Sequence, residues 1–150
     1  MIRGNKVYRN GFGLHRNGIS LGHKDTDNII EENHIYENAK HGIYFRSQTE
    51  SNGAHRNIIR NSVGERDARP LKDVVSEVRK FWKAEVEFCG IWVNGITHNL
   101  EISHNIIRET RPPEKRTQQK GIYLAPGVSQ VKIKKNRFSG LKQNIETLAE

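Results

Sequence analysis

The chain has 150 residues, of which 28% are charged and 34% hydrophobic, and its formal net charge is +8. This length suits one domain with its own core, and the charged residues are interspersed, which argues against disorder along the whole chain. No apolar run approaches the ~18 residues of a membrane span, and no signal peptide is recognisable after Met1. The single cysteine, Cys89, excludes an internal disulfide and a cysteine-based zinc site.

From the N-terminus onward, asparagines recur within a fixed pattern. The pattern is apolar-x-x-Asn-x-apolar, and its asparagines are Asn5, Asn33, Asn61, Asn105 and Asn136. A second pattern, Gly-Ile-x-apolar, follows the first four of them, at Gly18, Gly42, Gly90 and Gly121. Two signals that keep the same order through four cycles indicate a structural repeat.

Each cycle is expected to contain two or three short strands. Apolar residues alternate within the cycles, as at Leu100 and Ile102, and most of them are β-branched. An asparagine between two strand fragments favours a sharp turn. Stacked at about 4.8 Å on its equivalents, it would form a ladder of side-chain amides.

With these motifs, the chain resembles the right-handed parallel β-helix proteins of the pectin-lyase-like superfamily. The resemblance implies an all-β solenoid of about five coils, with residues 1–150 as a single segment. A leucine-rich repeat is the alternative, because Leu100 to Ile107 fit its core pattern. However, leucine is scarce at the other equivalent positions, and the Gly-Ile-x-apolar strand has no place in that repeat.

Two departures from the repeat predict insertions. Residues 67–86 read as an amphipathic helix, with Pro70 in its first turn, that covers the solenoid's flank or forms a wall of a binding groove. Its apolar stripe comprises Leu71, Val74, Val75, Val78, Phe81 and Trp82. Residues 111–120 read as a loop insertion, because Pro112 and Pro113 interrupt a strand.

The ends of the chain carry a further expectation. Ile2 already belongs to the first repeat, so no N-terminal cap precedes it. Solenoids need such caps, and we therefore expect either a fragment of a longer protein or self-association through open coil ends. The family resemblance implies an extracellular or periplasmic location.

The outward position of each Gly-Ile-x-apolar strand is occupied by Ser20, Tyr44, Trp92 or Tyr123. Stacked on successive coils, the three rings would form a file along which an extended polysaccharide can bind. Arg46 and Asn94 lie in the next outward row, where Arg46 can hold a uronate or sulfate. The alternative is that the rings only stabilise the sheet by cross-strand stacking.

The turn after the first such strand carries His23, Asp25 and Asp27. His23 can act as an acid or base, and the two carboxylates are a weak candidate for Ca²⁺, although in such a turn they more often bind the backbone. No other metal or cofactor is expected. Lyases and epimerases of the resembled superfamily need a proton acceptor and a group that neutralises the uronate, which implies Tyr44, His23 and Arg46 as catalytic candidates. No catalytic signature of these enzymes is present, so enzymatic activity stays open.

The net charge is concentrated in the last third of the chain. Residues 108–142 contain ten Lys or Arg and two Glu, which accounts for the whole excess of +8. This segment is either a solvated basic face or a site for an anionic glycan or nucleic acid. The sequence thus favours recognition of an extended acidic polysaccharide, with lyase or epimerase chemistry as an option. A non-catalytic structural or adhesive segment is the alternative, and nucleic-acid binding is a weaker one.

Overall fold

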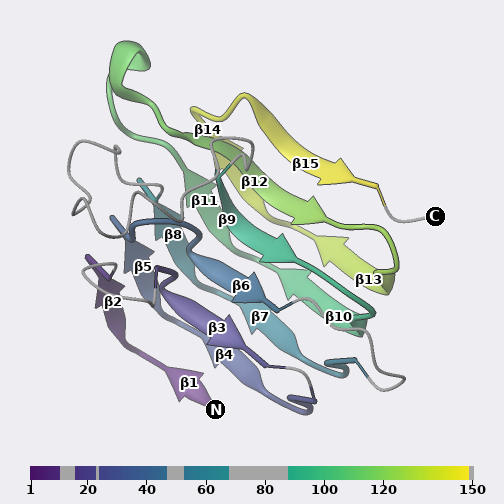
Figure 1. Ribbon diagram of the computed structural model, residues 1–150. Helices are drawn as coiled ribbons and strands as arrows, with labels where there is room; N and C mark the ends of the chain where they lie inside the picture. Colours follow the sequence, from purple (N-terminus) through teal and green to yellow (C-terminus); the bar gives the residue numbers. More distant parts are fainter. Residues whose placement is uncertain (11–15, 23, 47–52, 68–87, 149–150) are drawn as a thin grey trace.

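A computed structural model describes residues 1–10, 16–22, 24–46, 53–67 and 88–148. Its fifteen described strands form three five-stranded sheets (Figure 1). Sheet A contains β1 (Ile2–Arg3), β4 (Ile29–Glu31), β7 (Ile58–Arg60), β10 (His98–Ser103) and β13 (Ser129–Lys134). Sheet B contains β2 (Lys6–Tyr8), β5 (His34–Tyr36), β8 (Val63–Glu65), β11 (Ile106–Arg108) and β14 (Arg137–Ser139). Sheet C contains β3 (Ile19–Leu21), β6 (Ile43–Phe45), β9 (Phe88–Val93), β12 (Gln118–Leu124) and β15 (Gln143–Thr147).

The chain winds through the three sheets in the order A, B, C and then repeats. Every strand pairs in parallel with its equivalent in the next coil. The result is a parallel β-helix of five coils, with the N-terminal strand at one end of the stack and the C-terminal strand at the other (Figure 1). The all-β fold predicted from the repeat is therefore confirmed.

The core forms from the inward positions of the short strands. In sheet A, Ile30 pairs with Ile59 and Ile59 with Ile102, and all three are at most 1% exposed. Because side chains alternate between the two faces of a strand, only one or two residues per strand enter the core. This explains how a chain with few apolar residues fills a continuous interior.

In three of the four Gly-Ile-x-apolar strands, the glycine marks a close approach between sheets C and B, namely at Gly18, Gly90 and Gly121. A Cβ on Gly90 would lie 2.6 Å from the Cγ2 of Ile107, and one on Gly121 would lie 2.7 Å from the Phe138 ring. Only a residue without a side chain fits at these positions.

The asparagine ladder lies at the corner between sheets A and B. The Oδ1 of Asn33 accepts the backbone N–H of Asn5 at 3.0 Å. The Oδ1 of Asn136 likewise accepts the backbone and side-chain N–H groups of Asn105, at 2.9 and 3.0 Å. These four asparagines therefore occupy equivalent corners of the coil.

The prediction for Asn61 is wrong, because Ser62 fills the ladder position in the third coil. The hydroxyl of Ser62 accepts the N–H of Asn33 at 3.2 Å, and its own N–H donates to Asn105 at 3.0 Å. Asn61 is exposed and adopts a φ of 51°. The cause is a shift of one residue: Ile59, not Ile58, pairs with Ile30, and such a shift exchanges the faces of a strand.

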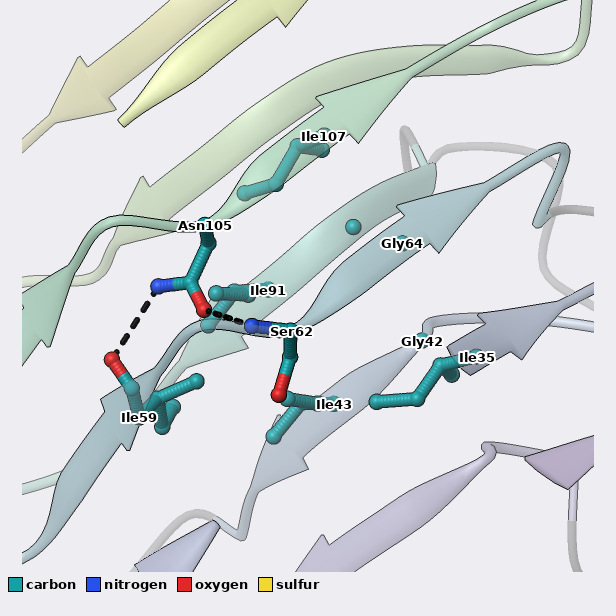
Figure 2. Close-up of a pocket in the computed structure, with 10 residues that line it drawn as sticks. Ile35, Gly42, Ile43, Ile59, Ser62, Gly64, Ile91, Asn105 and Ile107 are labelled. Atoms are coloured by element: carbon teal, nitrogen blue, oxygen red, sulfur yellow. Dashed lines mark hydrogen bonds between the residues drawn. The ribbon is translucent and has the colours of Figure 1, made fainter. Parts of the chain in front are cut away.

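The same shift places Gly64 in the inward column of sheet B, between Ile35 and Ile107. Beside it lies a cavity of about 10 Å³, which is also lined by Ser62 and Asn105 (Figure 2). A Cβ built on Gly64 would meet no atom within 4 Å. The third coil is therefore underfilled.

The two predicted insertions follow sheet B. Of residues 67–86, only Asp67 is described, as a buried residue at the corner after β8, and the rest of the predicted helix lies outside the described residues. The predicted loop 111–120 contains a 3₁₀ turn, η2 (Pro113–Lys115), but β12 already begins at Gln118. In the described part of the chain, no helix has the length and apolar character needed to cross a membrane.

Candidate functional site

The predicted aromatic file occupies one outward column of sheet C. Ser20 pairs with Tyr44, Tyr44 with Trp92, and Trp92 with Tyr123. The three rings are half-buried, and the ring centroids of Trp92 and Tyr123 are 4.1 Å apart at an interplanar angle of 34°. The two rings therefore contact each other across neighbouring strands in a tilted arrangement, and each covers part of the other.

A groove opens where the column of rings ends. Its volume is about 430 Å³, and it lies beside Ser20, where the first coil has a small side chain instead of a ring. It is lined by Arg16, Asn17, Ser20, Gly22, Lys40, Tyr44 and Arg46. Two of the sequence-predicted site residues, Tyr44 and Arg46, thus meet in one concave site.

The groove is assembled by pairing of the first two coils at the entry to sheet C. The N–H of Lys40 donates to the carbonyl of Arg16 at 2.8 Å, and that of His41 donates to the side chain of Asn17 at 3.2 Å. On the other side of Tyr44, the N–H of Arg46 donates to the carbonyl of Leu21 at 3.1 Å. The cationic residues are therefore held by backbone pairing at both sides of Tyr44.

The charged side chains that line the groove all have the same sign. Three of its lining residues are cationic, namely Arg16, Lys40 and Arg46, and none of the described lining residues is acidic. Burial lowers the pKa of the Lys40 ammonium, and the charge of Arg16 lowers that pKa further. Such a site favours an anion, and its lysine gives up a proton more readily than an exposed lysine does.

Tyr44 contacts the side chains of Asn94 and the buried His41. Its hydroxyl accepts a hydrogen bond from the Nδ2 of Asn94 at 3.3 Å. The ring of His41 lies 5.6 Å from that of Tyr44 and is 1% exposed. Burial, followed by the nearby charge of Lys40, holds the pKa of His41 well below its usual value, and its Nδ1 accepts the N–H of Cys89 at 3.1 Å.

Asp25 and Asp27 are not among the residues that line the groove. His23 lies outside the described residues. Asp25 accepts the N–H of Gly22 at 2.5 Å, while both oxygens of Asp27 bind Arg56, at 2.6 and 2.7 Å. Within the described ranges, no three His, Cys, Asp or Glu side chains converge as a metal site. The two carboxylates thus serve a turn and an ion pair.

Sequence reasoning missed Arg16 and Lys40. Both precede a Gly-Ile-x-apolar strand, by two residues in each case. Aligning Gly18 with Gly42 therefore brings the two cations side by side, and this alignment was the available signal.

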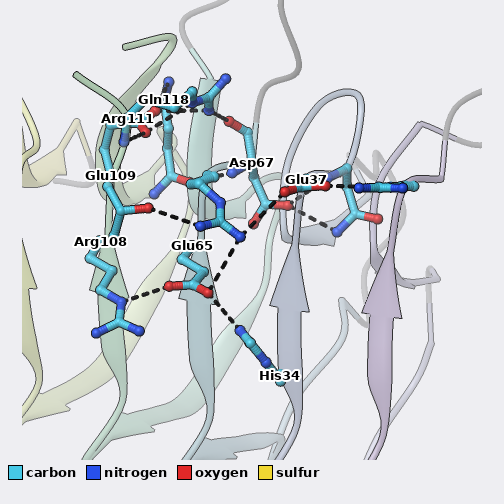
Figure 3. A network of polar contacts seen from close by, with 12 residues as sticks. His34, Glu37, Glu65, Asp67, Arg108, Glu109, Arg111 and Gln118 are labelled. Atoms are coloured by element: carbon cyan, nitrogen blue, oxygen red, sulfur yellow. Dashed lines mark hydrogen bonds and ion pairs between the residues drawn. The ribbon is translucent and has the colours of Figure 1, made fainter. Parts of the chain in front are cut away.

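A polar network lies where the chain leaves sheet B and turns toward sheet C (Figure 3). The buried carboxylate of Glu109 accepts the N–H groups of Arg111, Thr117 and Gln118, at 2.9, 3.3 and 3.1 Å. It also forms an ion pair with the Arg111 guanidinium at 2.8 Å. Glu109 therefore closes the loop from residue 111 to residue 117 at its base.

On the outer face of sheet B, Glu65 lies between Arg108 and His34, at 2.7 and 2.8 Å (Figure 3). Burial alone would raise the pKa of Glu65, but the hydrogen bonds from Arg108 and His34 outweigh it and lower the pKa below its usual value. This face is thus a network of paired charges.

Comparison with known proteins agrees with this geometry. The model of the family described as right handed beta helix region matches residues 1–146. No curated protein and no solved structure matches the chain. The family match confirms the predicted hand of the coil and covers all three sheets. The chain belongs to the right-handed β-helix family.

Proposed function

We propose that the groove beside Tyr44 binds an anionic sugar unit of an extended acidic polysaccharide. The observation that carries the proposal is the set of three cations, Arg16, Lys40 and Arg46, around one tyrosine in a groove with no described acidic lining. Domains of this family are often carbohydrate-active. Guanidinium groups bind carboxylates and sulfates through paired hydrogen bonds, and an aromatic ring offers an apolar surface to a sugar.

The column of rings indicates the path that the rest of the polymer would follow from the groove. Trp92 and Tyr123 continue from Tyr44 along the coil axis, one ring per coil. Strands of successive coils are about 4.8 Å apart, close to the length of one sugar unit. A chain anchored at the groove can therefore run along the outward column, past Asn94.

The same residues suit elimination or epimerisation at a uronate. Arg16 and Arg46 would neutralise the carboxylate and stabilise the negative charge that develops on it when the neighbouring carbon loses its proton. Lys40, whose pKa is lowered, would accept that proton on Nζ. In elimination, a carbon–carbon double bond then forms, the bond to the leaving glycosidic oxygen breaks, and that oxygen takes the phenolic proton of Tyr44.

Binding is tested by calorimetric titration with oligomers of polygalacturonate, alginate and a glycosaminoglycan. Lys40→Ala, Arg46→Ala and Tyr44→Ala should each weaken binding of the preferred oligomer at least several-fold. Lys135→Ala is the matched control, because Lys135 is an exposed cation at another corner of the coil. If the control weakens binding as much as the groove variants do, the interaction is a general charge effect and the groove proposal fails.

The titrations also separate the alternatives. The contact between Trp92 and Tyr123 favours a purely structural role for the rings, and the absence of binding to all three polymers would support that role. Binding of nucleic acid that falls steeply with salt, with the sugars inactive, would place the function on the basic segment 108–142 instead. Catalysis is assayed by the ultraviolet absorbance of the unsaturated uronate, which Arg46→Ala should abolish.

A further inference from the structure

A second amide ladder runs along the corner between sheets B and C and contains an acid. The Oδ1 of Asn38 accepts the backbone N–H and the side-chain N–H of Asn10, at 3.2 and 2.8 Å. The Oδ1 of Asp67 accepts the same two groups of Asn38, at 3.0 and 2.9 Å. Asp67 therefore takes the third ladder position with a carboxyl group in place of an amide.

The second oxygen of Asp67 replaces the amide nitrogen of a ladder asparagine, because its first oxygen takes the place of the amide oxygen. In the coil before it, the Nδ2 of Asn38 donates to the carbonyl of Val7 at 3.2 Å. The Oδ2 of Asp67 stands in the corresponding place, is fully buried, and has no hydrogen-bond partner among the described residues. A neutral acid can donate from this position as an amide does, whereas an ionised one would leave a buried, charged Oδ2 without a donor, although Oδ1 keeps its two donors from Asn38.

The groups around Asp67 agree with a neutral acid. Burial raises the pKa of Asp67 to about 8, against the hydrogen bonds from Asn38. Of the two charged groups that face it, Arg111 lowers this pKa and Glu109 raises it. These two are an ion pair with each other, and the Arg111 guanidinium donates to the backbone carbonyl of Asp67 at 2.5 Å.

Asp67 contacts both ends of the segment that carries Lys40. At one end it holds the backbone N–H of Asn38, two residues before Lys40. At the other end its Oδ2 is so close to Gly42 that a Cβ on this glycine would lie 2.6 Å away. Residues 38–42 are thus fixed between Asp67 and the backbone of the first coil, where Lys40 pairs with Arg16.

We propose that Asp67 is a positioning residue of the groove that acts in its neutral form, as a substitute amide that holds residues 38–42 and with them Lys40. Its ionisation at alkaline pH places an uncompensated charge against Gly42 and the ladder, which displaces this segment and weakens anion binding. The expected effect on anion binding rests on the proposed function of the groove, whereas the positioning of residues 38–42 by Asp67 does not.

The structural part is tested without any ligand. In amide NMR spectra recorded from about pH 6 to about pH 9.5, the resonances of Asn38, Lys40 and Gly42 should shift together with a midpoint near the pKa of Asp67. Asp67→Asn should remove this transition, because an amide keeps the ladder and cannot ionise. Asp27→Asn, which removes an exposed carboxylate at another corner, should leave it in place. The proposal is overturned if the wild-type resonances do not titrate, or if they titrate unchanged in Asp67→Asn.

The functional part uses a polygalacturonate oligomer as the probe. Wild-type affinity should fall several-fold over the same pH range, and that of Asp67→Asn should fall much less. An equal fall in both proteins would assign the effect to deprotonation of Lys40 and refute the role of Asp67. If the probe binds at no pH while the amide transition is present and depends on Asp67, the proposed function fails and the positioning of residues 38–42 stands.

Discussion

Replacing Gly64 by a larger residue should stabilise the protein, because this glycine leaves an inward position of sheet B empty. Its column is otherwise formed by larger side chains, namely Val7, Ile35, Ile107 and Phe138. A Cβ on Gly64 would contact no atom within 4 Å, and its φ is not in the left-handed region. Neither sterics nor backbone strain therefore opposes a side chain here.

The expected gain can be worked out from the atoms added. Gly64→Ala should contribute about 0.4–1 kcal/mol by restricting the unfolded chain, and about 0.8 kcal/mol by burying one carbon. Gly64→Val buries two further methyl groups beside Ile35 and Ile107, which brings the expected gain to about 3 kcal/mol. The carbons enter space that the neighbouring isoleucines border but do not fill (Figure 2).

The assay is equilibrium unfolding in urea, with Gly90→Ala as the matched control. A Cβ on Gly90 would lie 2.6 Å from Ile107 and 3.1 Å from the carbonyl of Gly121, so this variant should lose about 1–3 kcal/mol. Both variants should keep the slope of unfolding free energy against urea concentration. A loss of stability in Gly64→Ala, or no change in Gly90→Ala, would refute the packing assigned to the third coil.

Three further changes test the buried polar groups. Between the usual pKa of aspartate and the pKa of about 8 of Asp67, the folded chain binds more protons than the unfolded chain. The free energy of unfolding should therefore fall with rising pH in this window, by up to about 1.4 kcal/mol per pH unit. Unfolding of Asp67→Asn in urea at several pH values should show this slope removed. Asn105→Ala should cost about 2–4 kcal/mol in the same assay, because it leaves the N–H of Ser62 and the carbonyl of Ile59 without their partners. Glu109→Gln should make the peptide bonds of residues 112–116 susceptible to limited proteolysis, because it removes the counter-charge of the half-buried Arg111; cleavage at the wild-type rate would contradict this role.

The fold was predictable because its signals repeat, and the error at Asn61 shows where repetition misleads. The stretch around Ile58 and Ile59 fits the asparagine pattern only in the register of Ile58 and Asn61, whereas the structure uses the register shifted by one residue, with Ile59 inward and Ser62 in the ladder. A better guide was the identical tripeptide Asn-Ile-Ile at residues 28–30 and 57–59. In the structure, Asn28 donates its backbone N–H to the Oδ1 of Asn57 at 3.0 Å, in a third amide ladder.

The candidate site was predictable only where it lies on strands. The outward positions of Tyr44 and Arg46 follow from alternation along β6, so the sequence pattern was sufficient to place them together. Arg16 and Lys40 lie in the turn before sheet C, where no alternation exists and only the pairing of successive coils brings them together. The acid in the second ladder was equally hidden, because Asp67 is the first residue of the segment 67–86, which the sequence pattern assigned to an insertion.

The location of the groove follows from the different roles of the inward, ladder and outward residues of the coil. Inward residues and ladder amides hold successive coils together, so the outward column of sheet C can vary without loss of the core. The groove exists because that column changes from Tyr44 in the second coil to Ser20 in the first, while the flanking turns supply Arg16 and Lys40. A specific site on a solenoid therefore needs only one small outward residue beside a large one, together with charged turns whose positions the ladder fixes. Asp67 has both roles, since it belongs to the ladder that joins successive coils and at the same time holds the segment that carries Lys40.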